Sequence, residues 1–148
     1  MTYPWIKTVL LVEDSPGDVR LTKEAFREVT GFVQLQVATD GAEALSYLRR
    51  EGVHSDSPRP DIILLDLNLP KMDGRQVLAE IKGDANLKTI PTVILTTSAA
   101  EVDIARSYEL QANCYLNKPV LLDSFENVVK SINDFWLTKA TLPSLTLT

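Results

Sequence analysis

The sequence predicts a doubly wound α/β domain, in which a parallel sheet carries helices on both faces. Two observations support this fold class. Five short apolar runs recur along the chain, and helical patterns of apolar residues lie between them. Chains that alternate strand and helix form parallel sheets, because two parallel strands need a crossover connection. Most of the runs also lack the polar alternation that is typical of an antiparallel sheet with one face in water.

Each predicted element has its own signal in the sequence. The strands are expected at residues 9–12, 33–38, 62–65, 93–95 and 114–116, which are almost continuously apolar. Apolar residues at steps of three and four predict a first helix over 19–29 and a last helix over 125–136. Helix starts are indicated by Ser15 with Pro16 for the first helix, by Asp40 for the second, and by Asp123 with Ser124 near the last.

Two segments interrupt the alternation of strands and helices. Residues 51–60 are polar and rich in turn formers, which predicts an extended loop between the second helix and the third strand. Residues 138–148 form a tail that is too short to be a domain. We therefore expect one domain over residues 1–148, with its core at about 7–137.

Composition excludes several classes of function. The chain has 148 residues, with 15 Lys and Arg against 20 Asp and Glu, and a net charge of −5. This balance argues against nucleic acid as a partner, because DNA binding needs clustered positive charge. The single cysteine, Cys114, excludes an internal disulfide and suits a reducing, cytoplasmic compartment. No apolar run is long enough to predict insertion into a membrane, and the first residues do not resemble a signal peptide.

Polar residues follow four of the predicted strands, at the edge where parallel sheets bind ligands. They are Glu13 and Asp14, Asp66, Thr96 and Thr97, and Lys118. One acid after a strand is commonly a helix cap or a turn residue. Chance rarely places the whole set at the same edge, so the sequence predicts a site there.

Carboxylates that converge repel one another unless a cation lies among them. Oxygen ligands without His or Cys favour Mg²⁺, or alternatively Mn²⁺, over Zn²⁺. The Lys118 ammonium and the Thr96 hydroxyl suit the oxygens of a phosphoryl group, and a carboxylate beside a metal is a competent nucleophile toward phosphorus. These residues therefore predict magnesium-assisted phosphoryl chemistry.

The same residues carry a resemblance to a known family. The runs at 12–14, 65–74 and 95–96, followed by Lys118 and Pro119, resemble the receiver domain of two-component response regulators over residues 7–137. The resemblance implies a single receiver domain of flavodoxin-like topology, with strand order 2-1-3-4-5. It also implies a module that is not an enzyme, apart from an intrinsic autodephosphorylation, and that signals through protein contacts without an output domain.

The resemblance assigns a role to each site residue. Asp66 is the implied phosphoacceptor, which receives its phosphoryl group from a phosphohistidine on a sensor histidine kinase. The implied Mg²⁺ ligands are Glu13, Asp14, Asp66 and the backbone carbonyl of Asn68. The implied phosphate-binding and switch residues are Thr96, Thr97, Lys118 and Tyr115. The bond between Lys118 and Pro119 is commonly cis in this family.

Within the family, the chain is similar to the cyanobacterial phytochrome response regulators. The similarity rests on the 51–60 loop, on residues 95–98 and 113–115, and on residues 135–137 and 140–144. It implies a phytochrome-type kinase as partner and a tendency to dimerise. We expect a homodimer formed through Phe135, Trp136 and Leu142; the alternative is a tail that folds back over its own domain. The downstream protein is not identified by the sequence.

Two departures from the family pattern concern local geometry. Thr97 stands where the family usually has a smaller residue, and Gln111 stands where many receivers have glycine.

The sequence leaves two other functions open. One is a receiver-like docking module that works without phosphorylation. The other is a phosphatase of the haloacid dehalogenase type, which needs a second Asp where this chain has Asn68.

Overall fold

Five parallel strands form the sheet, in the order β2-β1-β3-β4-β5. The computed structural model describes residues 6–119 and 121–143. The strands are β1 (Lys7–Val12), β2 (Val33–Ala38), β3 (Ile62–Leu65), β4 (Thr92–Thr96) and β5 (Cys114–Asn117). The parallel sheet and its order confirm the fold class predicted from the apolar runs.

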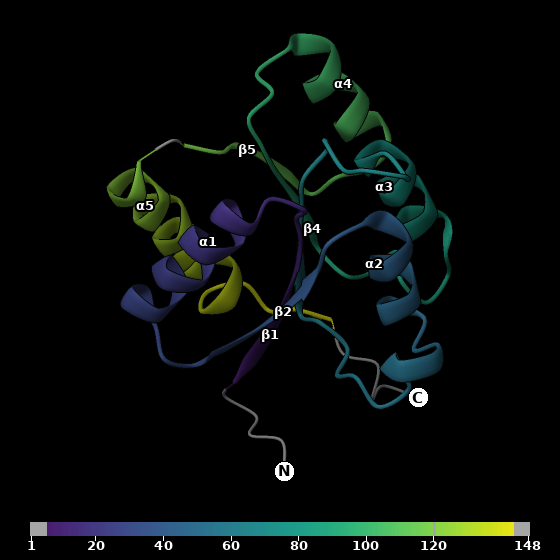
Figure 1. Ribbon diagram of the computed structural model, residues 1–148, viewed down its shortest axis with the longest axis horizontal. Coiled ribbons are helices and arrows are strands. Elements are labelled where there is room, and N and C mark those ends of the chain that lie inside the picture. Colours follow the sequence, from purple (N-terminus) through teal and green to yellow (C-terminus); the bar gives the residue numbers. More distant parts are fainter. Residues whose placement is uncertain (1–5, 120, 144–148) are drawn as a thin grey trace.

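Helices cover both faces of the sheet (Figure 1). α1 (Pro16–Val29) and α5 (Leu122–Ile132) pack together on one face, and α5 continues into a short π-helical segment, η2 (Asn133–Leu137). α2 (Gly41–Leu48) and α3 (Gly74–Gly83) pack together on the other face. α4 (Glu101–Glu109) connects β4 to β5, and a 3₁₀ turn, η1 (Gly52–His54), follows α2.

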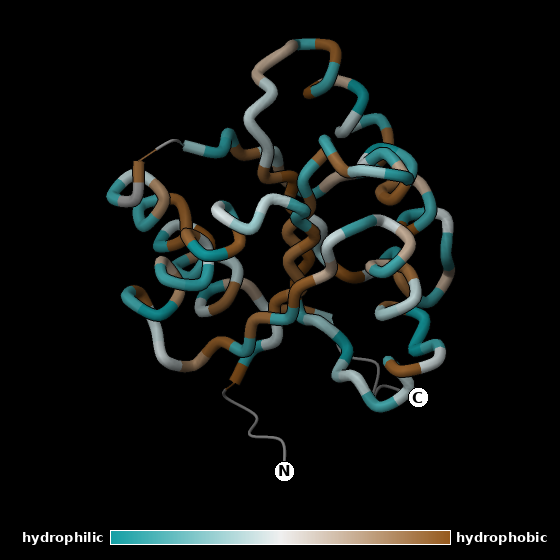
Figure 2. The backbone as a smooth tube through the Cα atoms, in the orientation of Figure 1, coloured by the Kyte–Doolittle hydropathy of each residue, from teal (hydrophilic) through white to brown (hydrophobic). Residues whose placement is uncertain are grey.

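The core consists of two apolar clusters, one on each side of the sheet. Successive strand residues point to opposite faces. Leu10 and Ile63 therefore belong to the cluster under α2 and α3, whereas Val9 and Ile62 belong to the cluster under α1 and α5. Figure 2 shows the strands as the apolar centre of the molecule. Burial on both faces is the reason that the central strands β1, β3 and β4 read as nearly continuous apolar runs.

Two of the three predicted helix starts agree with the structure. The Ser15 hydroxyl accepts a hydrogen bond from the Asp18 amide and caps α1, and the Asp40 carboxylate accepts one from the Glu43 amide and caps α2. α5 starts at Leu122, slightly earlier than expected. Asp123 therefore lies in its first turn, and no side chain caps the start of the helix.

The irregular segments also agree with the prediction. Residues 51–60 contain only the short η1 turn, and the Tyr47 hydroxyl holds the loop by donating to the Pro58 carbonyl at 2.8 Å. Residues 144–148 of the tail lie outside the described part. Of the helices within the described ranges, none combines the length and the apolar character that crossing a bilayer requires.

Candidate functional site

Two neighbouring strands bring three acids to one edge of the sheet. β1 pairs with β3 up to Val12 and Leu65, so the residues that follow, Glu13 and Asp66, leave the sheet side by side. One carboxylate oxygen from each of Glu13, Asp14 and Asp66 lies within 4.8 Å of the others. Glu13 and Asp66 are buried, and Asp14 is exposed. The predicted acid cluster is therefore present, with one side open to solvent.

Lys118 lies directly after β5 and extends into this cluster. Its buried ammonium donates to the Glu13 carboxylate, to Asp66 Oδ2 at 3.0 Å and to Asp18 Oδ2 at 2.9 Å. Burial alone would lower the pKa of Lys118, but hydrogen bonds to Glu13 and Asp18 and the surrounding negative charge raise it above its ordinary value. The lysine is thus held as a cation among three carboxylates.

Asp18 is a site residue that the sequence analysis missed. It lies in the first turn of α1, where an acid is commonly explained by the helix dipole. Only the packing of α1 beside the end of β5 brings its carboxylate to the Lys118 ammonium, 100 positions later in the sequence.

Glu13 carries the strongest electrostatic perturbation of the acids. Burial raises the pKa of its carboxyl to about 7, and the charge of Asp66 adds to this shift. The hydrogen bond from Lys118 acts in the opposite direction but does not cancel the effect of burial. Glu13 therefore exchanges its proton near neutral pH rather than near pH 4.5.

The expected cis bond before Pro119 is not found. The described residues contain no cis peptide bond, so the bond between Lys118 and Pro119 is trans and the prediction was wrong. A trans bond is the preferred isomer before proline by about 0.5–1 kcal/mol. Lys118 reaches Glu13 and Asp66 from this backbone.

Thr96 is the last residue of β4 and is fully buried. Its hydroxyl oxygen has no hydrogen-bond partner within the part of the chain that the structure describes. A buried polar atom without a partner costs about 1–3 kcal/mol, so this hydroxyl is suited to a ligand oxygen. Thr97, the next residue, is exposed.

A polar network holds the loop between β4 and α4. The Tyr115 hydroxyl and the Asn117 side-chain amide both donate to the Ser98 carbonyl at 2.9 Å. The Ser98 hydroxyl donates to Asp103 on α4, and Arg75 on α3 donates to the same carboxylate, each at 2.5 Å. These two donors lower the pKa of Asp103. Tyr115, predicted as a switch residue, is thus attached to the loop that follows Thr96.

A close backbone contact positions Asp66. Its Oδ1 accepts the Asn68 amide at 3.2 Å. A Cβ atom at Gly74 would lie 2.3 Å from the Asp66 carbonyl oxygen and 2.5 Å from Leu67 Cα. Only glycine fits there, so the start of α3 packs directly against the backbone of the acid.

The two aromatic residues of η2 differ in exposure. Phe135 is 54% exposed, whereas Trp136 is partly buried against the core cluster beneath α1 and α5. Their rings meet edge to face, with centroids 5.2 Å apart. One aromatic ring of this pair thus joins the core and the other does not. Leu142 in the tail is partly exposed.

Comparisons with known proteins agree with this geometry. The family described as the response regulator receiver domain matches residues 9–130. Response regulator Rcp1 of Synechocystis sp. (strain PCC 6803) is 50% identical over 138 residues, which are 93% of this chain and 94% of Rcp1.

Two solved structures are similar over the same extent. The phosphorylated cyanobacterial phytochrome response regulator RcpA matches with a TM-score of 0.90 and 52% identity, over 94% of this chain and 99% of RcpA. The Mn²⁺-bound form of Rcp1 matches with a TM-score of 0.87 and 50% identity, over 93% of this chain and 99% of that structure.

Proposed function

This chain belongs to the response regulator receiver domain family, and we propose that it is a phosphorylation-activated response regulator whose phosphoacceptor is Asp66. One observation carries this proposal. The buried Asp66 carboxylate faces the Lys118 ammonium at 3.0 Å, and the adjacent strand ends in the buried hydroxyl of Thr96 that lacks a partner. Together, an acid, a cation and a hydroxyl without a partner at one sheet edge can accept a phosphoryl group and bind its oxygens.

The proposed reaction transfers a phosphoryl group from a histidine of a sensor kinase. An Asp66 carboxylate oxygen attacks phosphorus, the bond between phosphorus and the histidine nitrogen breaks, and the imidazole leaves with the bonding electrons. Lys118 neutralises one phosphoryl oxygen by charge-assisted hydrogen bonding. The Thr96 hydroxyl donates to another oxygen and thereby gains the partner that it lacks.

The acid cluster fits a divalent metal ion. Four carboxylates, those of Glu13, Asp14, Asp18 and Asp66, lie at this site, and three of them share the single Lys118 ammonium, so the site carries excess negative charge. All ligands are oxygens, which suits Mg²⁺ or Mn²⁺. We propose Glu13, Asp14, Asp66 and the Asn68 carbonyl as ligands, and the Mn²⁺-bound form of Rcp1 supports this assignment. When bound, the metal neutralises charge on the phosphoryl oxygens.

The proposed output is a change of protein contacts. Phosphorylation replaces the single charge of Asp66 with about two negative charges. Movement of Thr96 toward the new oxygens would displace the loop that Tyr115 and Asn117 hold through the Ser98 carbonyl. α4 follows this loop, so its exposed surface is the part that a downstream protein would sense. We propose Thr97, which is exposed beside Thr96, as a modulator of access to the phosphoryl group.

The proposed upstream partner is a phytochrome-type histidine kinase. Support comes from the similarity to RcpA, which is described as a cyanobacterial phytochrome response regulator. The site chemistry gives no role to nucleic acid or to a membrane. A cytoplasmic location is also proposed, on the basis of the single cysteine.

A docking module that works without phosphorylation is the second candidate. The buried pair of Asp66 and Lys118 speaks against it, because docking alone would not require a costly buried charge cluster. A dehalogenase-type phosphatase is disfavoured because Asn68 replaces the acid that its mechanism needs.

Intact-mass measurement after incubation with acetyl phosphate and Mg²⁺ tests the main proposal. We expect one phosphoryl adduct on the wild type and on the control Asp56→Asn, which changes an exposed loop acid. We expect none on Asp66→Asn. The absence of an adduct on the wild type would favour the docking module, and an adduct that persists on Asp66→Asn would refute the assigned acceptor.

We also propose a homodimer that uses Phe135, Trp136 and Leu142. The 54% exposure of Phe135 supports it, because an exposed apolar surface that includes a large aromatic residue is suited to self-association. Sedimentation velocity should show a dimer for the wild type and for the control Val53→Ser, which removes an apolar residue that is 94% exposed. Phe135→Ser should sediment as a monomer. A wild type that stays monomeric with acetyl phosphate would contradict the dimer.

A further inference from the structure

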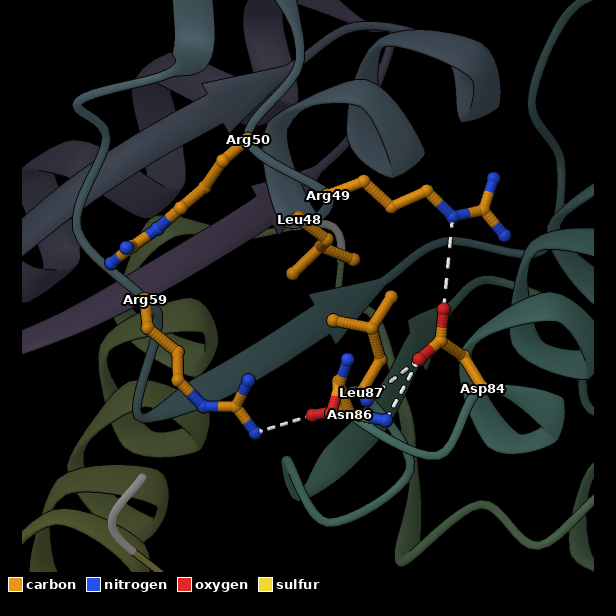
Figure 3. A pocket seen from close by; sticks show the side chains of 7 residues that line it. All are labelled: Leu48, Arg49, Arg50, Arg59, Asp84, Asn86 and Leu87. Atoms are coloured by element: carbon orange, nitrogen blue, oxygen red, sulfur yellow. Dashed lines mark hydrogen bonds and ion pairs between the residues drawn. The ribbon is translucent and has the colours of Figure 1, made fainter. Parts of the chain in front are cut away.

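A hollow of about 390 Å³ lies at the end of the sheet opposite the acid cluster. It is formed by the end of α2, the segment before β3 and the segment after α3 (Figure 3). Arg49, Arg50 and Arg59 line it together with Asp84. We propose that this hollow binds a small ligand that carries phosphate groups.

One of the three arginines is already neutralised. Arg49 pairs with Glu80 at 3.1 Å and with Asp84 at 3.8 Å. The Asp84 carboxylate also accepts the amides of Asn86, at 2.8 Å, and Leu87, at 3.3 Å. Figure 3 shows Arg49 extending toward Asp84, whereas Arg50 extends in the other direction, to the side where Arg59 lies.

The other two arginines have no acidic partner among the described residues. Within residues 6–119 and 121–143, neither Arg50 nor Arg59 forms an ion pair. Arg59 is oriented by its Nη2 group, which donates to the Asn86 carbonyl at 2.7 Å and to Thr89 Oγ1 at 3.2 Å. Its other guanidinium nitrogens take no part in these bonds. Burial, with a contribution from the charge of Arg50, lowers the pKa of Arg59. Arg50 and Arg59 therefore line one hollow without an ion pair of their own, while Asp84, the acid in its lining, pairs with Arg49.

The backbone at Arg50 adds a second observation. Arg50 has φ of +55°, in the left-handed region that glycine and asparagine adopt more readily. Glycine or asparagine would suit this turn better, yet the position holds an arginine, whose long cationic side chain lines the hollow.

The size and charge of the hollow select the class of ligand. Two guanidinium groups without ion pairs match a phosphate or diphosphate group better than a single carboxylate, and the guanidinium fork binds phosphate oxygens in pairs. A volume of about 390 Å³ is at the lower end of small-molecule sites. Leu48 and Leu87 supply an apolar wall for the organic part of such a ligand. Because the whole chain carries −5, binding depends on these local contacts.

Inorganic pyrophosphate is a suitable probe, titrated against ¹⁵N-labelled full-length protein in EDTA at constant ionic strength. We expect saturable NMR shifts at the backbone amides of Arg50, Asn86 and Leu87 and at the side-chain Nε of Arg59. Arg50→Asn, which suits the turn, and Arg59→Gln should each weaken binding about tenfold. The control Arg20→Gln, which removes an exposed arginine from α1, should bind as the wild type does.

Three outcomes would overturn the assignment. The first is the absence of saturation at these residues up to millimolar pyrophosphate. The second is equal weakening by Arg20→Gln and Arg50→Asn, which would indicate screening of overall charge. The third is saturation by a pentaglutamate peptide but not by pyrophosphate, which would identify an acidic protein segment as the occupant. Thermal denaturation of each variant shows whether it is folded, so a loss of binding is interpretable.

Discussion

Replacing Lys118 with methionine tests whether its ammonium stabilises the buried acids. At 3.0 Å and an effective dielectric constant of about 20, the attraction between Lys118 and Asp66 is about 5 kcal/mol. Burial of the lysine charge opposes this by several kcal/mol. Removal of the cation leaves Glu13 and Asp66, only 2% and 6% exposed, without a counter-charge. We expect the free energy of unfolding at pH 8 to fall by about 4 kcal/mol.

The loss should depend on pH because Glu13 can take up a proton. Burial raises its pKa to about 7, so the folded state binds a proton that the unfolded state releases at about pH 4.5. Such a group destabilises the folded state progressively as pH rises from about 4.5 to about 7. The Lys118 ammonium lowers the pKa of Glu13, so without Lys118 this destabilisation with rising pH is larger. The cost of Lys118→Met should therefore be about 2 kcal/mol at pH 6, half of its value at pH 8.

Urea denaturation in EDTA at both pH values measures these free energies. The double variant Lys118→Met with Glu13→Gln serves as the control, because it removes one of the two stranded charges. It should recover at least half of the loss at pH 8. A loss below about 1 kcal/mol, equal losses at both pH values, or no recovery in the double variant would refute the reasoning.

Three further changes give distinct outcomes. Gln111 has φ of +72°, so Gln111→Gly should raise the free energy of unfolding by about 1 kcal/mol in urea denaturation, and Gln111→Ala should give no gain. Gly74→Ala should cost about 3 kcal/mol and slow phosphorylation by acetyl phosphate, because its Cβ would collide with the Asp66 backbone. Gly83→Ala, whose Cβ meets nothing within 4 Å, is its control and should be stable. Mg²⁺ affinity by calorimetry should fall about tenfold per pH unit below the Glu13 pKa of about 7 and level off above it; a flat profile would contradict Glu13 as a ligand.

The strand-end rule explains why much of the acid cluster could be predicted. Glu13 and Asp66 each follow an apolar run, and parallel strands end at one edge, so their proximity follows from the order of elements. Thr96 and Lys118 also follow predicted strands and are expected at this edge for the same reason. The lack of a hydrogen-bond partner at the Thr96 hydroxyl could not be predicted, because it depends on the exact positions of neighbouring side chains.

Other features have no local signal. Asp18 contacts Lys118 across 100 positions, and Arg75 contacts Asp103 across 28, so neither pair is visible in a pattern of adjacent residues. The hollow that Arg50 and Arg59 line is formed by segments that meet only when α2 and α3 pack on the same face. The trans bond before Pro119 was also not predictable, because the isomer depends on tertiary context.

The amino-acid sequence by itself determined the parallel α/β fold and the edge at which the acids gather. Both follow from periodicity and from order along the chain, which are local properties. Only the tertiary structure decided which acids Lys118 contacts, how far burial shifts the pKa of Glu13 and that Arg50 and Arg59 form no ion pair with the described residues. These properties depend on distance and burial, and side-chain packing sets both between residues that are remote in sequence.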